Sequence, residues 1–260
     1  MTALDAPRVR GTGPLRSGTV LIGRSLRHSL RDGEGLVMAV ALPVMMLLLF
    51  TYVFGGAILD DGYIDFVVPG VILTCAGFGA SSVAVAVNRD LHLGAMRRFR
   101  TLPIRSWTVL VGHVAASVLR NLLATAIVIA VALALGFRPT AGPGRWALVV
   151  ILVALWILAI TALFAGIGMI AGSPEAASGY GFVLLFLPYL SSAFVPTETM
   201  PSWLRPVAEH QPMGPLVDAL RALLIGGADV QLLPPILWSL GITAAAGVLV
   251  TQVLRRSQDR

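Results

Sequence analysis

Two ionisable side chains, His113 and Arg120, fall inside one long apolar stretch at residues 106–137. They are seven residues apart, about two helical turns, so they would lie on one helix face. Because ionisable groups inside a membrane mark pathways, we predict a polar face that lines a pathway or a subunit seam. Alternatively, His113 lies near the cytoplasmic end of the helix, and Arg120 reaches the interface or pairs with a helix-end carbonyl. No acidic residue lies in such a stretch, which disfavours proton-coupled exchange.

The other reactive residue types do not form a catalytic pattern. All 19 basic residues are arginines, which excludes a P-loop lysine and Schiff-base chemistry. The single cysteine, Cys75, has no partner for an internal disulfide. The four histidines lack metal-ligand spacing, and no serine lies in a nucleophile elbow. We therefore expect a chain that is not an enzyme and carries no metal or cofactor of its own.

Residues 89–105 combine five arginines with several apolar side chains. A loop that only meets water does not need apolar groups, whereas a docking surface buries them and uses charge for register. We predict that a partner docks here, through Asp90, Met96, Arg97, Arg98, Phe99 and Arg100. The alternative is a basic loop held on anionic lipid.

The N-terminal segment has the pattern of an amphipathic helix. Apolar residues recur at helical spacing on one side, and arginines fall on the other: Ile22, Leu26 and Leu30 against Arg24, Arg27 and Arg31. Such a helix lies in the membrane interface, with its apolar face in lipid and its arginines on headgroups. The alternative is a basic flank with no further role.

Residues 197–229 hold short apolar helical stretches interrupted by prolines. They are too short to span a bilayer, so we predict re-entrant or interfacial helices that close the outer mouth of a pathway. The residues proposed for this outer gate are Pro201, Trp203, Glu209 and His210. Asp218 and Arg221 are three residues apart and are expected to pair across one turn.

The elements that carry these residues are membrane helices. The chain has 260 residues, of which 57% are hydrophobic and only 12% charged, and a helix of about 20 apolar residues spans a bilayer. We predict an all-α integral membrane protein with six spans. They are residues 36–59, 66–88, 106–137, 146–174, 176–197 and 230–254, with Ser173 as N-cap and Pro174 as first residue of the fifth helix.

Arginine placement predicts the orientation. Residues 1–35, 89–105 and 255–260 carry fourteen arginines, against four in the opposite connections, so both termini are expected in the cytoplasm. This gives a cytoplasmic N-terminus (1–35), a six-span membrane domain (36–254) and a cytoplasmic tail (255–260). The net charge of +6 follows from this topology, so no nucleic-acid partner is expected. The first span would act as an uncleaved insertion signal.

Three stretches resemble the ABC-2 type permease family, and within it the daunorubicin-resistance drug exporters. They are YVFGGAI at 52–58, MRRFRTLPI at 96–104 and LSSAFVPTETMP at 190–201, the last followed by EHQP at 209–212. The resemblance implies a permease subunit of the bacterial cytoplasmic membrane. It would form a dimer with a second copy or a homologous permease and work with a separate ATPase subunit that binds ATP and Mg. In that family the N-terminal helix and the loop after the second span transmit ATPase closure.

The resemblance implies export of hydrophobic or amphiphilic compounds, including antibiotics, by alternating access. Several aromatic residues would suit such substrates, although packing explains them equally: Phe50, Phe78, Trp156, Phe164, Phe186 and Tyr189. The alternatives are an exporter of lipid or polysaccharide envelope precursors, a secondary transporter without an ATPase, and a membrane scaffold. Membrane lipids are expected contacts in every case.

Overall fold

The structure, a computed structural model, describes residues 33–58, 62–92, 106–184, 186–227 and 229–258. Two predicted features lie outside these residues. They are the amphipathic helix with Ile22, Arg24, Leu26, Arg27, Leu30 and Arg31, and the loop residues Met96, Arg97, Arg98, Phe99 and Arg100.

The described part of the chain is helical and contains no strand. In chain order the elements are α2 (Gly33–Leu48), the π-helix η1 (Leu49–Phe54), α3 (Gly55–Ile58), α4 (Tyr63–His92), α6 (Ser106–Ala134), α7 (Pro143–Ile170), α8 (Pro174–Leu184), the 3₁₀ helices η2 (Leu187–Leu190) and η3 (Thr197–Thr199), α9 (Arg205–His210), α10 (Met213–Leu224) and α11 (Leu233–Gln258).

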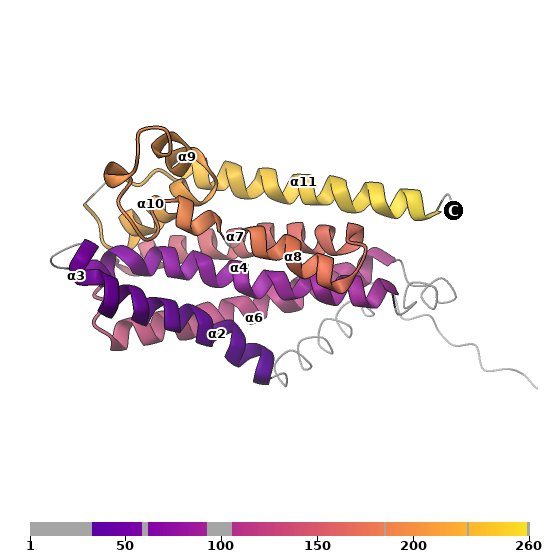
Figure 1. Cartoon of the computed structure of the whole chain (residues 1–260), viewed down its shortest axis with the longest axis horizontal. Coiled ribbons are helices and arrows are strands. Elements are labelled where there is room, and N and C mark those ends of the chain that lie inside the picture. The colour runs from indigo at the N-terminus through magenta and orange to yellow at the C-terminus, as the bar shows by residue number, and fades with distance from the viewer. Residues whose placement is uncertain (1–32, 59–61, 93–105, 185, 228, 259–260) are drawn as a thin grey trace, which may run out of the picture.

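Five helical stretches in the described ranges are long and apolar enough to cross a membrane. They are Ala39–Ile58, Tyr63–Leu91, Val114–Ala134, Pro143–Ile170 and Leu233–Val253. Each covers most of one predicted span. They lie side by side, with α2 and α6 running opposite to α4, α7 and α11 (Figure 1). The chain therefore has to return along the bundle between α7 and α11.

This return path is broken, whereas the sequence predicted one uninterrupted helix at 176–197. The structure has the eleven-residue α8, then η2, then extended backbone at Ser191. Pro188 explains part of the break, because proline has no N–H for the helical ladder and restricts the residue before it. Figure 1 shows α8 near the end that holds the C-terminus and α9 and α10 at the opposite end.

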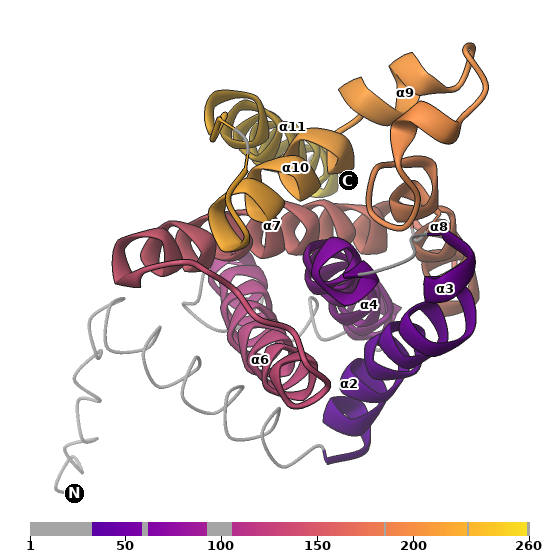
Figure 2. The same cartoon turned by 90° about the vertical axis from the view of Figure 1, so that its left-hand side faces the viewer.

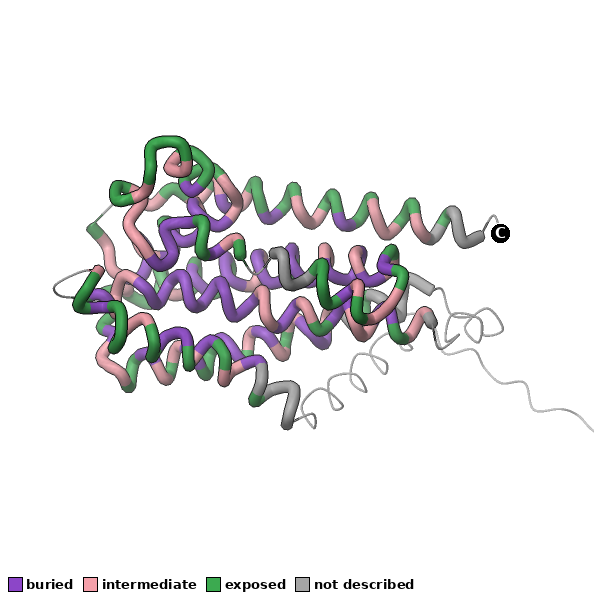
Figure 3. Tube along the Cα trace, in the orientation of Figure 1, coloured by how far each residue is buried: buried purple, intermediate pink, exposed green. Residues whose placement is uncertain are grey.

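Helix α4 occupies the centre of the bundle and contacts α2, α6, α7, α8 and α10 (Figures 2 and 3). Small residues allow this close approach. A Cβ atom added to Gly70 would lie 2.6 Å from Ala193 Cβ, and one added to Gly168 would lie 2.9 Å from Ala84 Cα. Gly79 likewise packs directly against the side chain of Asn121. α11, by contrast, is mostly exposed (Figure 3).

The turn between α7 and α8 has the predicted cap. Ser173 Oγ accepts a hydrogen bond from the Ala176 amide at 3.2 Å, and Pro174 is the first residue of α8. The Ser173 hydroxyl thus satisfies one of the free amides at the helix start. The predicted cap is confirmed.

We predict that Gly168→Ala lowers the thermal stability of the protein in detergent. The new methyl group would meet the backbone of Ala84, and overpacking of this kind costs roughly 1–3 kcal/mol. Gly247→Ala in α11 is the matched control, because nothing lies within 4 Å of its added Cβ. Equal melting temperatures for both variants would contradict the close α4–α7 contact.

Candidate functional site

The predicted short helices before the last span are present as α9 and α10 at one end of the bundle (Figure 1). α10 buries one face against α4, α7 and α11. Its buried apolar residues are Met213, Leu216, Val217, Ala219, Leu220, Ala222, Leu223 and Leu224. α9 buries only Ala208. We call residues 187–225, most of which the sequence predicts on the outer side of the membrane, the outer segment.

The residues predicted for the outer gate lie on the surface of this segment. Pro201, Trp203, Glu209 and His210 are all exposed, Trp203 to 74%. His210 Nδ1 lies 3.0 Å from Pro206 O within its own helix. The structure does not bring these side chains together, and their role in gating stays a prediction.

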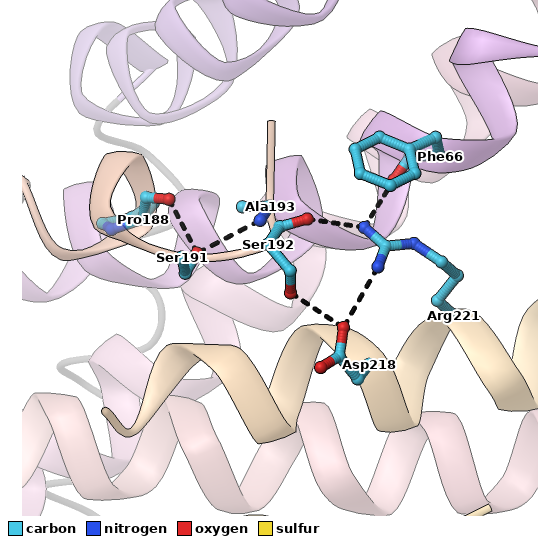
Figure 4. Close-up of polar contacts among 7 residues, drawn as sticks. All are labelled: Phe66, Pro188, Ser191, Ser192, Ala193, Asp218 and Arg221. Atoms are coloured by element: carbon cyan, nitrogen blue, oxygen red, sulfur yellow. Dashed lines mark hydrogen bonds and ion pairs between the residues drawn. The ribbon is translucent and has the colours of Figure 1, made fainter. Parts of the chain in front are cut away.

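Arg221 of α10 is the centre of the polar contacts in the outer segment (Figure 4). Its Nη1 lies 3.1 Å from Asp218 Oδ1, and its Nη2 donates to Phe66 O at 3.1 Å and Ser192 O at 2.7 Å. Ser192 Oγ donates to Asp218 Oδ1 at 2.8 Å. The guanidinium carbon also lies 3.9 Å from the centre of the Phe66 ring. One cation therefore joins α10, the first turn of α4 and the extended chain after η2.

Burial lowers the pKa of Arg221, and the carboxylates of Asp218 and Glu198 oppose this shift. Arginine nevertheless stays charged in proteins, so the group presents fixed donors to carbonyl oxygens. The predicted Asp218–Arg221 pair is confirmed. The spacing could not reveal the carbonyl partners, because they come from distant parts of the chain.

Two further side chains, Gln211 and Arg205, donate hydrogen bonds to backbone carbonyls of the chain that follows α8. Gln211 Nε2 donates to Leu187 O at 3.0 Å and to Leu190 O at 3.1 Å. Arg205 donates from Nε to Thr197 O at 3.1 Å and from Nη2 to Glu198 O at 2.8 Å. These donors pair with carbonyls that have left the regular helical ladder. Gln211 belongs to the EHQP motif but was not assigned a role from the sequence.

Arg120 lies in the middle of α6 and turns towards α4. Its Nη2 donates to the hydroxyl of Ser82 and lies 3.5 Å from Gly79 O. The neighbouring Asn121 is fully buried against Gly79. Arg120 thus contacts a backbone carbonyl in the middle of α4, not one at a helix end as the alternative above expected. The side chain of His113 lies outside the described residues, so a shared polar face stays a prediction.

Of the residues predicted to dock a partner, only Asp90 lies in the described part of the chain, half-buried in the last turn of α4. Two residues earlier, Asn88 is 1% exposed and its Nδ2 donates to Gly168 O at 3.0 Å and Ala171 O at 2.7 Å. No sequence pattern singles out Asn88, because it stands at the boundary of a predicted span.

A cavity of about 30 Å³ lies between α4, α7, η2 and α10. Its lining is mostly apolar: Leu73, Thr74, Gly77, Trp156, Ile160, Phe164, Leu187, Pro188 and Met213. Drug-sized ligands need several hundred cubic ångströms, so this cavity is too small to hold one. Trp156 and Phe164 are buried packing residues, whereas Phe186 and Tyr189 are exposed.

Comparison with known proteins shows the family. The sequence model of the ABC-2 type transporter matches residues 17–225, and the chain belongs to this family. It is 33% identical over 226 residues to the daunorubicin resistance ABC transporter permease protein DrrB1 of Streptomyces coeruleorubidus, covering 85% of this chain and 79% of that protein.

Two further relatives are more distant. The probable doxorubicin resistance ABC transporter permease protein DrrC of Mycobacterium tuberculosis H37Rv is 24% identical, over 90% of this chain and 86% of its own length. The probable multidrug ABC transporter permease YbhR of Escherichia coli K12 is also 24% identical, over 74% of this chain and 52% of its own length.

We predict that Arg221→Met destabilises the protein in detergent by about 2–3 kcal/mol, because it removes charge-assisted hydrogen bonds from buried carbonyls. Arg221→Lys should recover only part of the loss, since a single ammonium cannot reproduce the planar fork. Arg145→Met, at an exposed position, is the control. A melting temperature of Arg221→Met equal to that of the control would show that the cluster contributes no stability.

Proposed function

We propose that the chain is the permease subunit of an ATP-driven exporter of hydrophobic or amphiphilic compounds, drugs among them. The observation that carries the proposal is the family match over residues 17–225 together with relatives named as drug resistance permeases. The apolar helices suit a membrane subunit. Because the sequence has no lysine for a P-loop, ATP and Mg would bind to a separate ATPase subunit.

The proposed topology has six passages with both termini in the cytoplasm. The five long helices supply five, and the broken path from α8 through η2 supplies the sixth, because α7 and α11 run in the same direction. The outer segment would close the outer mouth in this arrangement. Its hydrogen-bonded carbonyls support a position at membrane depth, where irregular backbone must be satisfied by protein.

Two permeases, identical or homologous, would form the transport unit with the ATPases. ATP binding favours one arrangement of the pair and hydrolysis the other, so that the pathway opens alternately to each side. Loop 89–105 would receive the movement of the ATPase, since it joins α4 to α6 and combines arginines with apolar residues. The amphipathic helix at the N-terminus would rest on lipid beside it.

We predict that the tagged permease, purified in mild detergent from its native membrane, retains a stoichiometric Walker-motif ATPase. Replacing Arg97, Arg98 and Arg100 together by alanine should reduce the recovered ATPase about tenfold, because the loop loses its charged contacts. Membrane insertion of this variant should equal that of the wild type. A folded, monodisperse wild-type preparation without an ATPase would overturn the proposed function. An unchanged yield of ATPase with the triple variant would overturn only the assignment of the loop.

We predict the orientation of the chain from cysteine labelling. In a Cys75→Ala background, a membrane-impermeant maleimide should label Asp229→Cys, before α11, in intact cells. Ser257→Cys, at the other end of α11, should react only after the membrane is permeabilised, since a span separates the two positions. The opposite pattern would reverse the proposed orientation.

A further inference from the structure

The last turn of α4 is bonded to the end of α7 through Asn88. The carbonyls of the last helical turn have no partner within their own helix. Gly168 O is one of these, and Ala171 O follows at the cap, where the backbone becomes extended. Asn88 Nδ2 donates to both, at 3.0 and 2.7 Å. The amide of one helix therefore caps the negative end of another.

The backbones of α4 and α7 touch one turn before this cap. Ala84 and Asn88 are four residues apart and share one face of α4. A Cβ atom added to Gly168 would meet the backbone of Ala84, so no side chain separates the two helices. Contact at Ala84 and hydrogen bonds at Asn88 together prevent α4 from sliding along α7 or turning against it.

The same cap fixes the start of α8. Only Ala171, Gly172 and Ser173 separate α7 from α8, and Ser173 caps α8 through the Ala176 amide. α8 then packs along α4 and leads into the outer segment. A displacement of the last turn of α4 is thus transferred to the α7–α8 turn and, through α8, towards the contacts of Arg221.

We propose that Asn88 is the positioning residue that transmits movement of the cytoplasmic loop to α7 and α8. The inference rests on the proposed function, in which an ATPase moves that loop. Asn88 is the last almost fully buried residue of α4 before Arg89 and Asp90, and its side-chain amide donates to the end of α7 and to the turn that follows it. Without the Asn88 amide, the ATPase should stay bound and hydrolyse ATP, but less substrate should be transported per ATP.

The test uses the permease and its ATPase reconstituted together in liposomes, with daunorubicin as the transported probe. Asn88→Leu has nearly the same shape as the wild type but no donor. It should keep its ATPase and its basal hydrolysis, while daunorubicin moved per ATP falls about tenfold, the usual scale of a coupling energy. Asn88→Ser retains one donor, so its daunorubicin moved per ATP should lie between the values of Asn88→Leu and the wild type. It replaces Asn88→Leu in the test if that variant does not insert into the membrane.

Asn121→Leu is the matched control, because it replaces another fully buried asparagine on a helix beside α4. It should lose stability yet keep the wild-type ratio of transport to hydrolysis. The inference would be overturned if Asn88→Leu moved as much daunorubicin per ATP as the wild type. It would also be overturned if Asn88→Leu and Asn121→Leu lost this ratio equally. Either result would leave the proposed function intact. A wild-type permease that binds no ATPase, or that moves no daunorubicin with ATP, would instead overturn the proposed function.

Discussion

The end of the bundle that holds α9 and α10 depends on the partly buried cation of Arg221. Inside a membrane a chain can leave the helical conformation only where protein groups satisfy its carbonyls. Between α8 and α10 the chain does leave it, and Arg221 then bonds Ser192 O on the extended backbone and Phe66 O on α4. Gln211 does the same for the carbonyls around η2. The broken path is stable here because its donors come from later in the chain, namely from α10 and from the turn between α9 and α10.

Helix α4 takes part in hydrogen bonds between a side chain and a backbone carbonyl at both of its ends. Its first turn accepts a hydrogen bond from Arg221, and its last turn donates two through Asn88. Between them, small residues such as Ala84 bring neighbouring backbones into contact. In a close-packed interior, interfaces shift between discrete arrangements rather than deform continuously. In the proposed topology, α4 is therefore suited to carry a change at its Asn88 end to the outer segment.

The long helices could be predicted from the sequence, because uncharged stretches of membrane length leave few other structures. The Ser173 cap and the Asp218–Arg221 pair were also predictable, since both act within a few residues. The count of apolar residues missed the break near Pro188, because it measures length and not backbone conformation. The carbonyl contacts of Arg221 and Asn88 were missed because they join residues 29 to 155 positions apart and depend on helix packing that no spacing encodes.

The most direct test of the account is transport by purified components. The permease is placed in liposomes with and without its ATPase, and daunorubicin accumulation is measured with ATP or with an imposed pH gradient. Accumulation is expected only when ATP and the ATPase are both present, and collapsing the pH gradient should not change it. Accumulation driven by the pH gradient in liposomes that contain the permease alone would contradict it.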